Sequence, residues 1–183
     1  MKYIFEAGML KRVARSGWWT EKVANPESVA DHTFRAAVIA FILAKMEGLD
    51  DESANRICTA AVFHDMHETR LLDLNKITAR YIEVTRELEL KVERAQVEGM
   101  EPKIKNSILK TLKLSTREHT IMKDADYLEC AFQAKEYADI GYAGTQVWVD
   151  NLAKKLKSKS AKSLAGKLKK TNSGIWRDGL RKI

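Results

Sequence analysis

Apolar residues at helical spacing run through almost the whole chain, and this periodicity constrains the fold more than any other feature. Between residues 28 and 47, for example, seven apolar residues fall on one helical face: Val29, Phe34, Ala37, Val38, Phe41, Ile42 and Met46. The sequence contains neither the sustained alternation that is typical of strands nor an internal repeat. A chain of 183 residues is long enough for one domain with a core and short for two. The sequence therefore predicts a single all-α domain.

Capping residues and glycines divide this pattern into separate helices. The predicted helices span residues 3–14, 28–47, 51–65, 78–98, 103–113, 116–137 and 145–170. Ser28 is a candidate N-cap, as is Asp50 or Asp51 for the next helix, because a side-chain oxygen there can accept from a free backbone N–H. Gly48 ends the helix between them. The stretch HETRLLDLNK predicts a turn followed by an irregular or short helical piece.

The positive net charge of the chain belongs to its C-terminal end. The whole chain carries +7, whereas residues 151–183 carry +10, so the first 150 residues carry −3. We expect residues 1–150 to form the main domain and residues 151–183 to form a Lys-rich helical extension, packed on it or trailing from it. Such a helix is usually a solvated face, although it could also steer anionic substrates. Its one aromatic residue, Trp176, is a poor stacking platform, which weighs against nucleic-acid binding.

The sequence predicts a cytoplasmic protein. No apolar run approaches the roughly 20 residues that cross a bilayer, and the N-terminus lacks the apolar stretch of a signal peptide. Cys58 and Cys130 lie inside predicted helices, where we expect two reduced thiols rather than a disulfide.

Two histidines and two aspartates interrupt three of the predicted helices. His32 lies in SVADHTF, His64 and Asp65 lie in AAVFHDMHE, and Asp126 lies in KDADYLECAF. Taken singly, a core histidine or a buried salt bridge explains each position. Because burying several unpaired ionisable groups is costly, the four together favour one metal site. Asp124 is the alternative to Asp126, since residues two apart point about 200° apart on a helix.

Imidazole nitrogens and carboxylate oxygens together accept Mn, Co, Ni, Fe, Zn or, less well, Mg. The sequence therefore predicts one divalent ion without naming it. Four protein ligands on a six-coordinate ion leave two positions, one for water and one for a substrate oxygen. This arrangement indicates metal-assisted hydrolysis.

The ordered pattern H…HD…D, within LKRVARSGW, ESVADHTFRAA, AAVFHDMHE and KDADYLE, resembles the HD-domain metal-dependent phosphohydrolase superfamily. The resemblance is strongest to its 5′-deoxynucleotidase branch, and it runs from about residue 10 to about residue 140. It implies an HD-domain helical bundle and a homodimer. It also implies a nucleoside monophosphate substrate, with hydrolysis of deoxyribonucleoside 5′-monophosphates.

The resemblance also implies roles for individual residues. The positions that match the metal ligands are His32, His64, Asp65 and Asp126. Glu68 matches an acidic residue that handles protons, and Arg15 matches an arginine that holds phosphate. Asp73 matches a carboxylate that contacts the sugar hydroxyl, and Trp18 matches a tryptophan that shapes the sugar pocket. Two residues separate Arg15 from Trp18, where some bacterial members have the pair adjacent, so Trp19 is an alternative.

Two other functions stay open at this point. One is another HD-type reaction on a nucleoside triphosphate or on a cyclic or polyphosphorylated nucleotide, although the Gly-Tyr-Pro signature of the cyclic-diguanylate branch is absent. The other is a non-catalytic, metal-stabilised module that binds RNA or protein through the basic segment. The presence of Arg15, Glu68 and Asp73 weighs against that module, because a structural ion needs none of them.

Overall fold

A computed structural model describes residues 1–181, and this part of the chain contains no strand, only one isolated β-bridge between Ala14 and Ser28. The α-helices are α1 Lys2–Ala7, α2 Val29–Met46, α3 Asp51–Phe63, α4 Glu68–Leu71, α5 Arg86–Gln96, α6 Pro102–Thr111, α7 Thr116–Asp139, α8 Gln146–Ala153 and α9 Lys159–Leu168. The predicted all-α fold is confirmed. None of the described helices is long and apolar enough to span a membrane.

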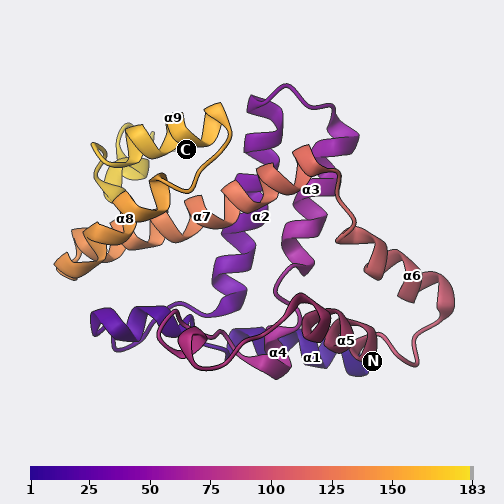
Figure 1. Ribbon diagram of the computed structural model, residues 1–183. Coiled ribbons are helices and arrows are strands. Elements are labelled where there is room, and N and C mark those ends of the chain that lie inside the picture. The colour runs from indigo at the N-terminus through magenta and orange to yellow at the C-terminus, as the bar shows by residue number, and fades with distance from the viewer. Residues whose placement is uncertain (182–183) are drawn as a thin grey trace.

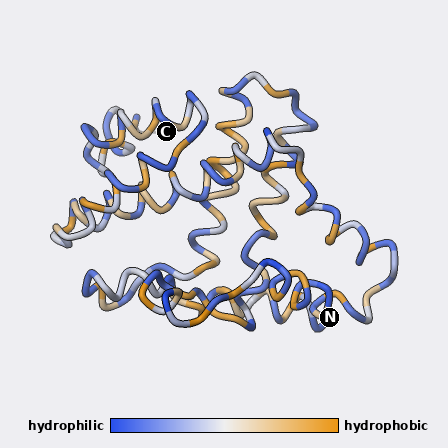
Figure 2. Tube along the Cα trace, viewed as in Figure 1, coloured by the Kyte–Doolittle hydropathy of each residue, from blue (hydrophilic) through white to orange (hydrophobic). Residues whose placement is uncertain are grey.

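Three helices form the centre of the molecule. α2 lies beside α3, and the long helix α7 crosses both, while α8 and α9 pack on α7 (Figure 1). Hydrophobic and hydrophilic stretches alternate along these helices, as expected where one face of a helix covers a core (Figure 2). The larger side chains of the main core are Ile39, Leu43, Ile57, Ile121, Leu128 and Leu156.

The central helices begin where the sequence predicts. Ser28 and Asp31 form a reciprocal capping box at the start of α2, and Ser115 and Glu118 form another at the start of α7. Gly48, with φ of +75°, follows α2 in a left-handed conformation that favours glycine. These local signals fix the ends of the two helices that carry His32 and Asp126.

Two predicted helices are shorter than expected. The helix predicted over 78–98 contains only a 3₁₀ turn, Thr78–Arg80, and then α5. The Asn75 side chain accepts from the backbone N–H groups of Ile77 and Thr78, and Thr85 caps α5, so these polar side chains replace the helical hydrogen bonds. The helix predicted over 3–14 likewise ends at Ala7 and continues as a 3₁₀ turn.

The helix predicted over 145–170 is divided into α8 and α9. Asp124, which is almost fully buried in α7, accepts from the backbone N–H groups of Lys157 and Ser158 and so holds the chain open between the two helices. Leu152 and Leu168 are buried against α7 beside Trp18. Residues 151–169 therefore contribute to the core, while most of their lysines lie in solvent.

The apolar face that the sequence suggests for α2 is for the most part not its buried face. Phe34, Val38, Phe41, Ile42 and Met46 are all exposed, and Phe34 has 73% of its surface accessible. The buried face instead carries small residues and two larger aliphatic ones: Ala36, Ala40, Ala44, Ile39 and Leu43. Small side chains let α3 and α7 approach α2 closely, so the helix packs through a different face from the one that its bulkiest residues mark.

Candidate active site

Four side chains from the central helices converge inside the molecule, and we call them the ligand cluster: His32, His64, Asp65 and Asp126. His32 comes from α2, His64 and Asp65 directly follow α3, and Asp126 lies midway along α7. His32 Nε2 lies 3.3 Å from Asp126 Oδ1 and 3.6 Å from Asp65 Oδ2. His64 Nε2 lies 3.0 Å from Asp65 Oδ2. The structure thus brings together the four residues that the sequence predicts as ligands.

Each imidazole is oriented through its other nitrogen. His32 Nδ1 forms a hydrogen bond with the fully buried carboxylate of Glu129, and Arg35 donates to that carboxylate from Nε and Nη2 at 3.0 and 2.8 Å. His64 Nδ1 lies 2.7 Å from the carbonyl oxygen of Ala61. These contacts turn both Nε2 atoms toward the two aspartates, which is how proteins orient histidines that bind a metal.

The chemistry of the ligand cluster fits a divalent cation. Within residues 1–181, both Nε2 atoms are buried and lack a hydrogen-bond partner, which is costly unless something else binds them. Burial and the nearby Arg15 oppose protonation of His32, but the nearby carboxylate of Asp126 and the hydrogen-bonded carboxylate of Glu129 outweigh them and raise its pKa to about 10. The carboxylates therefore favour a positive charge at this position, and a bound divalent ion would supply one.

Asp124, the alternative ligand, faces away from the ligand cluster. Its carboxylate is 1% exposed and bonds to the backbone N–H groups of Lys157 and Ser158, at 2.9 and 2.7 Å. It therefore holds the start of α9, whereas Asp126 points toward His32 (and toward Lys123, whose Nζ lies 2.5 Å away).

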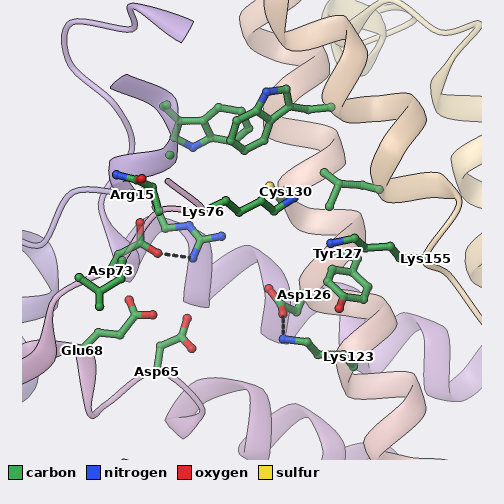
Figure 3. A pocket seen from close by; sticks show the side chains of 16 residues that line it. Arg15, Asp65, Glu68, Asp73, Lys76, Lys123, Asp126, Tyr127, Cys130 and Lys155 are labelled. Carbon is green, nitrogen blue, oxygen red and sulfur yellow. Dashed lines mark hydrogen bonds and ion pairs between the residues drawn. The ribbon is translucent and has the colours of Figure 1, made fainter. Parts of the chain in front are cut away.

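A pocket of about 320 Å³ adjoins the ligand cluster, and Asp65 and Asp126 form part of its lining (Figure 3). Arg15 and Asp73 line the same pocket, and Arg15 Nη1 donates to Asp73 Oδ1 at 3.2 Å. The backbone N–H of Ser16 donates to the other carboxylate oxygen at 2.6 Å. The two residues predicted to hold phosphate and sugar are therefore neighbours, fixed by their contact with each other.

Glu68 also lines the pocket, at the first position of α4. Its Oε2 atom is buried and has no hydrogen-bond partner among residues 1–181. Burial, together with the carboxylates of Asp65 and Asp73, raises the pKa of Glu68 to about 9. A carboxyl group in this position can keep its proton near neutral pH, which suits a group that transfers protons.

The HD domain family model matches residues 7–169, which cover the ligand cluster, the pocket and α9. This chain belongs to the HD domain family.

Proteins that are similar to this chain include the 5′-deoxynucleotidase HDDC2 of Bos taurus. The two are 31% identical over 148 residues, which are 76% of this chain and 68% of the bovine protein. Among solved structures, the crystal structure of genomics APC5600 is 37% identical, with a TM-score of 0.81 and 96% of each chain covered. The cyanophage S-2L HD phosphohydrolase DatZ, bound to dA and one catalytic Zn²⁺, shares the fold at 15% identity and a TM-score of 0.59, with 91% of this chain and 96% of DatZ covered.

Trp18, rather than Trp19, belongs to the pocket of this HD domain. Trp18 is 1% exposed and packs against Trp148 and Tyr137, with ring centroids 4.6 and 5.2 Å away. Its Nε1 atom donates to Glu27 Oε1 at 2.9 Å. Trp19 is 56% exposed and does not line the pocket.

Four residues that line the pocket were not singled out by the sequence analysis, and we call them the lysine wall: Lys76, Tyr127, Trp148 and Lys155. These residues lie on a loop, on α7, on α8 and just after α8, so only the tertiary fold brings them together. Glu129 was also missed, although it had a signal. It lies three residues after Asp126, on the same helical face and between apolar neighbours.

The two cysteines are free thiols in the structure, as predicted. Cys130 lines the pocket, where burial raises its pKa to about 12. It therefore stays protonated and contributes an apolar surface rather than a nucleophile.

Proposed function

We propose that this protein is a metal-dependent phosphomonoesterase that hydrolyses deoxyribonucleoside 5′-monophosphates to deoxynucleosides and phosphate. The observation that carries the proposal is the position of the ligand cluster beside a pocket that also holds Arg15, Glu68 and Asp73. Relatives named 5′-deoxynucleotidase support the same reaction and substrate class.

Each of the three pocket residues has a role that its surroundings support. Arg15 uses one guanidinium nitrogen on Asp73 and keeps further donors for the oxygens of a phosphate. Asp73 accepts from Arg15 and from the backbone of Ser16, which leaves lone pairs that can accept from a sugar hydroxyl. Glu68, with its raised pKa, can give a proton to the oxygen that leaves phosphorus.

The ligand cluster would hold one divalent ion through His32, His64, Asp65 and Asp126. Such an ion lowers the pKa of a bound water and neutralises charge on a phosphoryl oxygen. Mn, Co, Ni, Fe, Zn and Mg are the candidates, since the donor set of two imidazoles and two carboxylates accepts each of them.

A phosphate-release screen tests the proposed reaction. Purified protein is incubated with all nucleoside and deoxynucleoside mono-, di- and triphosphates, each with Mn, Co, Ni, Fe, Zn and Mg in turn. We expect release from deoxyribonucleoside 5′-monophosphates. Equal release from ribonucleotides would contradict the deoxy selectivity, and no release from any substrate would contradict the reaction itself.

We also propose that the protein is a homodimer in which the exposed face of α2 meets a second copy. Phe34, Val38, Phe41 and Ile42 lie on that face. An almost wholly apolar groove of about 500 Å³ runs beside Phe34, between α1 and the start of α2. Exposed apolar surface of this extent is typical of an interface between proteins. The proposed compartment is the cytoplasm, in keeping with two free thiols.

Light scattering after size-exclusion chromatography tests the dimer. Phe34→Asp places a charge in the proposed interface, and we expect it to shift the molar mass from that of two chains to that of one. Trp176→Asp is the control, because Trp176 is similarly exposed, at 71%, but lies on the 3₁₀ turn Ser173–Arg177 rather than on α2. A wild-type protein with the mass of one chain would refute the dimer.

A further inference from the structure

The pocket carries more positively charged side chains than one phosphate at the ligand cluster requires. Four cationic side chains line the pocket: Arg15, Lys76, Lys123 and Lys155. Arg15 is paired with Asp73, and Lys123 is paired with Asp126. Within residues 1–181, Lys76 and Lys155 form no ion pair with any carboxylate. Two ammonium groups in the pocket are therefore left without an anion.

The side chains of Lys76 and Lys155 are exposed, and both ammonium groups lie near aromatic rings that line the pocket. Lys76 Nζ lies 5.8 Å from the ring centroid of Trp148, and Lys155 Nζ lies 5.1 Å from that of Tyr127. Cations at this distance from an aromatic face are attracted to it. In Figure 3 the two lysines extend into the pocket from opposite sides, and they come from different parts of the chain. Their meeting is a product of the fold.

The two ammonium groups also repel each other. Burial and the charge of Lys76 lower the pKa of Lys155, and Lys123 adds to the same effect. Like charges held together without an intervening anion cost free energy, and a bound anion would remove that cost. Lys123, which is paired with Asp126 of the ligand cluster, already provides a cation beside the expected position of the reacting phosphate.

We propose that Lys76 and Lys155 form a subsite for a second phosphate group on the same nucleotide. This inference rests on the proposed nucleotidase function and extends it. The pocket then takes nucleotides that carry two phosphates, either as a 5′-diphosphate or as a 3′,5′-bisphosphate, and binds them more tightly than the 5′-monophosphate.

Binding of analogues that cannot be hydrolysed tests the subsite. Titration calorimetry on the metal-loaded protein compares deoxyadenosine 5′-monophosphate, 5′-diphosphate and 3′,5′-bisphosphate, each with a methylene group in place of every bridging oxygen on the 5′ side. We expect at least one doubly phosphorylated analogue to bind about tenfold more tightly than the monophosphate analogue, since charge-assisted contacts contribute on this scale. Whether the diphosphate or the bisphosphate gains affinity identifies the position of the second phosphate.

Variants assign that gain to the lysine pair. In Lys76→Met and Lys155→Met, which keep a long apolar side chain on the aromatic rings, we expect the affinity ratio of doubly to singly phosphorylated analogue to fall about tenfold. Lys155→Arg keeps the charge and should keep most of the ratio. Lys154→Met is the matched control: it removes the same charge from the neighbouring residue, which does not line the pocket.

The outcomes separate the subsite from the nucleotidase proposal. An unchanged ratio in both methionine variants, or no gain from a second phosphate in the wild type, would overturn the subsite and leave the nucleotidase proposal intact. Tight, lysine-dependent binding without phosphate release from any nucleotide would support the subsite and overturn the nucleotidase proposal. No binding of any analogue would overturn both.

Discussion

The ligand cluster and the lysine wall lie in one pocket but are built differently. In the ligand cluster, each imidazole is fixed by a second contact, His32 by Glu129 and His64 by a backbone carbonyl. In the lysine wall, Lys76 and Lys155 are long, exposed side chains that lie near aromatic faces and form no ion pair with any of residues 1–181. A metal site needs donors at fixed positions, whereas flexible ammonium groups can adapt to anions in several places. We therefore expect changes in the ligand cluster to abolish function and changes in the lysine wall to adjust it.

The largest effect is expected for Asp126→Ala. The variant loses a carboxylate that faces the two imidazoles, and with it the metal and the several kcal/mol of transition-state stabilisation that a metal provides. Activity should fall by about 10³-fold or more. Metal content by mass spectrometry and phosphate release from a deoxyribonucleoside monophosphate measure the two losses.

Asp124→Ala is the control for this variant. Asp124 binds the chain between α8 and α9, so its removal should lower the free energy of unfolding by about 1–3 kcal/mol while the metal stays bound. If Asp124→Ala loses the metal and Asp126→Ala retains it, the ligand assignment is wrong.

A smaller effect is expected for Glu129→Gln, which leaves every ligand in place. The amide keeps the shape of the carboxylate but no longer supports His32 with a negative charge. Loss of such a partner typically lowers metal affinity by about 10- to 100-fold, and competition with a fluorescent chelator measures the change. Glu136→Gln is the matched control, since Glu136 also binds Arg35 but lies farther out, with 39% of its side chain exposed. Equal losses in both variants would show that Arg35, and not the carboxylate on His32, matters.

Residues near each other in sequence or on one helix could be predicted, and those that only the fold brings together could not. His64, Asp65 and Glu68 lie within five consecutive residues, and the motif AAVFHDMHE around them indicated their roles. Trp148 and Lys155 carry no local signal, because their neighbours in the pocket are Trp18 and Tyr127, which lie 130 and 28 residues away. Pairings at such separations depend on how α7 and α8 pack, which helical periodicity does not specify.

The same limit of helical periodicity explains why the sequence suggested the wrong buried face for α2. Its bulky residues form an apolar face that resembles a core face, but hydrophobic periodicity cannot tell a core from an interface. The choice depends on the alanines of the opposite face, which permit close approach of α3 and α7. By contrast, the starts of α2 and α7 depend on capping residues a few positions apart, and both starts were predicted correctly.

In the lysine wall, Trp148→Leu should weaken substrate binding without abolishing activity. Trp148 packs on Trp18 and lies beneath Lys76, so the variant loses an aromatic contact and the support of one ammonium group. Such contacts contribute about 0.5–1.5 kcal/mol each, so KM should rise about threefold to tenfold. Steady-state kinetics measure KM, with Trp176→Leu as the control. A fall in kcat to the level of Asp126→Ala would contradict the proposed difference between the two regions.

At Glu27 we expect an effect on stability rather than on activity. Glu27 lies between the two regions: it accepts from Trp18 and lies near Glu129. Burial, with the charge of Glu129, raises the pKa of Glu27 to about 7 in the folded protein, against 4.5 ordinarily. The folded state thus holds a proton that the unfolded state releases between these values. The contribution of Glu27 to the free energy of unfolding is therefore fully present below pH 4.5, and it is lost as the pH rises through 7.

Glu27→Gln keeps an acceptor for Trp18 and removes the titration. The variant should match the wild type near pH 4.5 and exceed it at pH 8 by about 3 kcal/mol, or about 6–12 °C in Tm, which thermal unfolding across this range measures. Asp139→Asn should show the opposite sign, because Lys135 lowers the pKa of Asp139 and its stabilising effect is present at high pH. A Tm difference for Glu27→Gln that stays constant from pH 4.5 to 8 would mean that Glu27 is ionised throughout. Glu27 would then carry a fixed negative charge, as the carboxylates of the ligand cluster do. Trp18 would mark the boundary between the ligand cluster and the lysine wall.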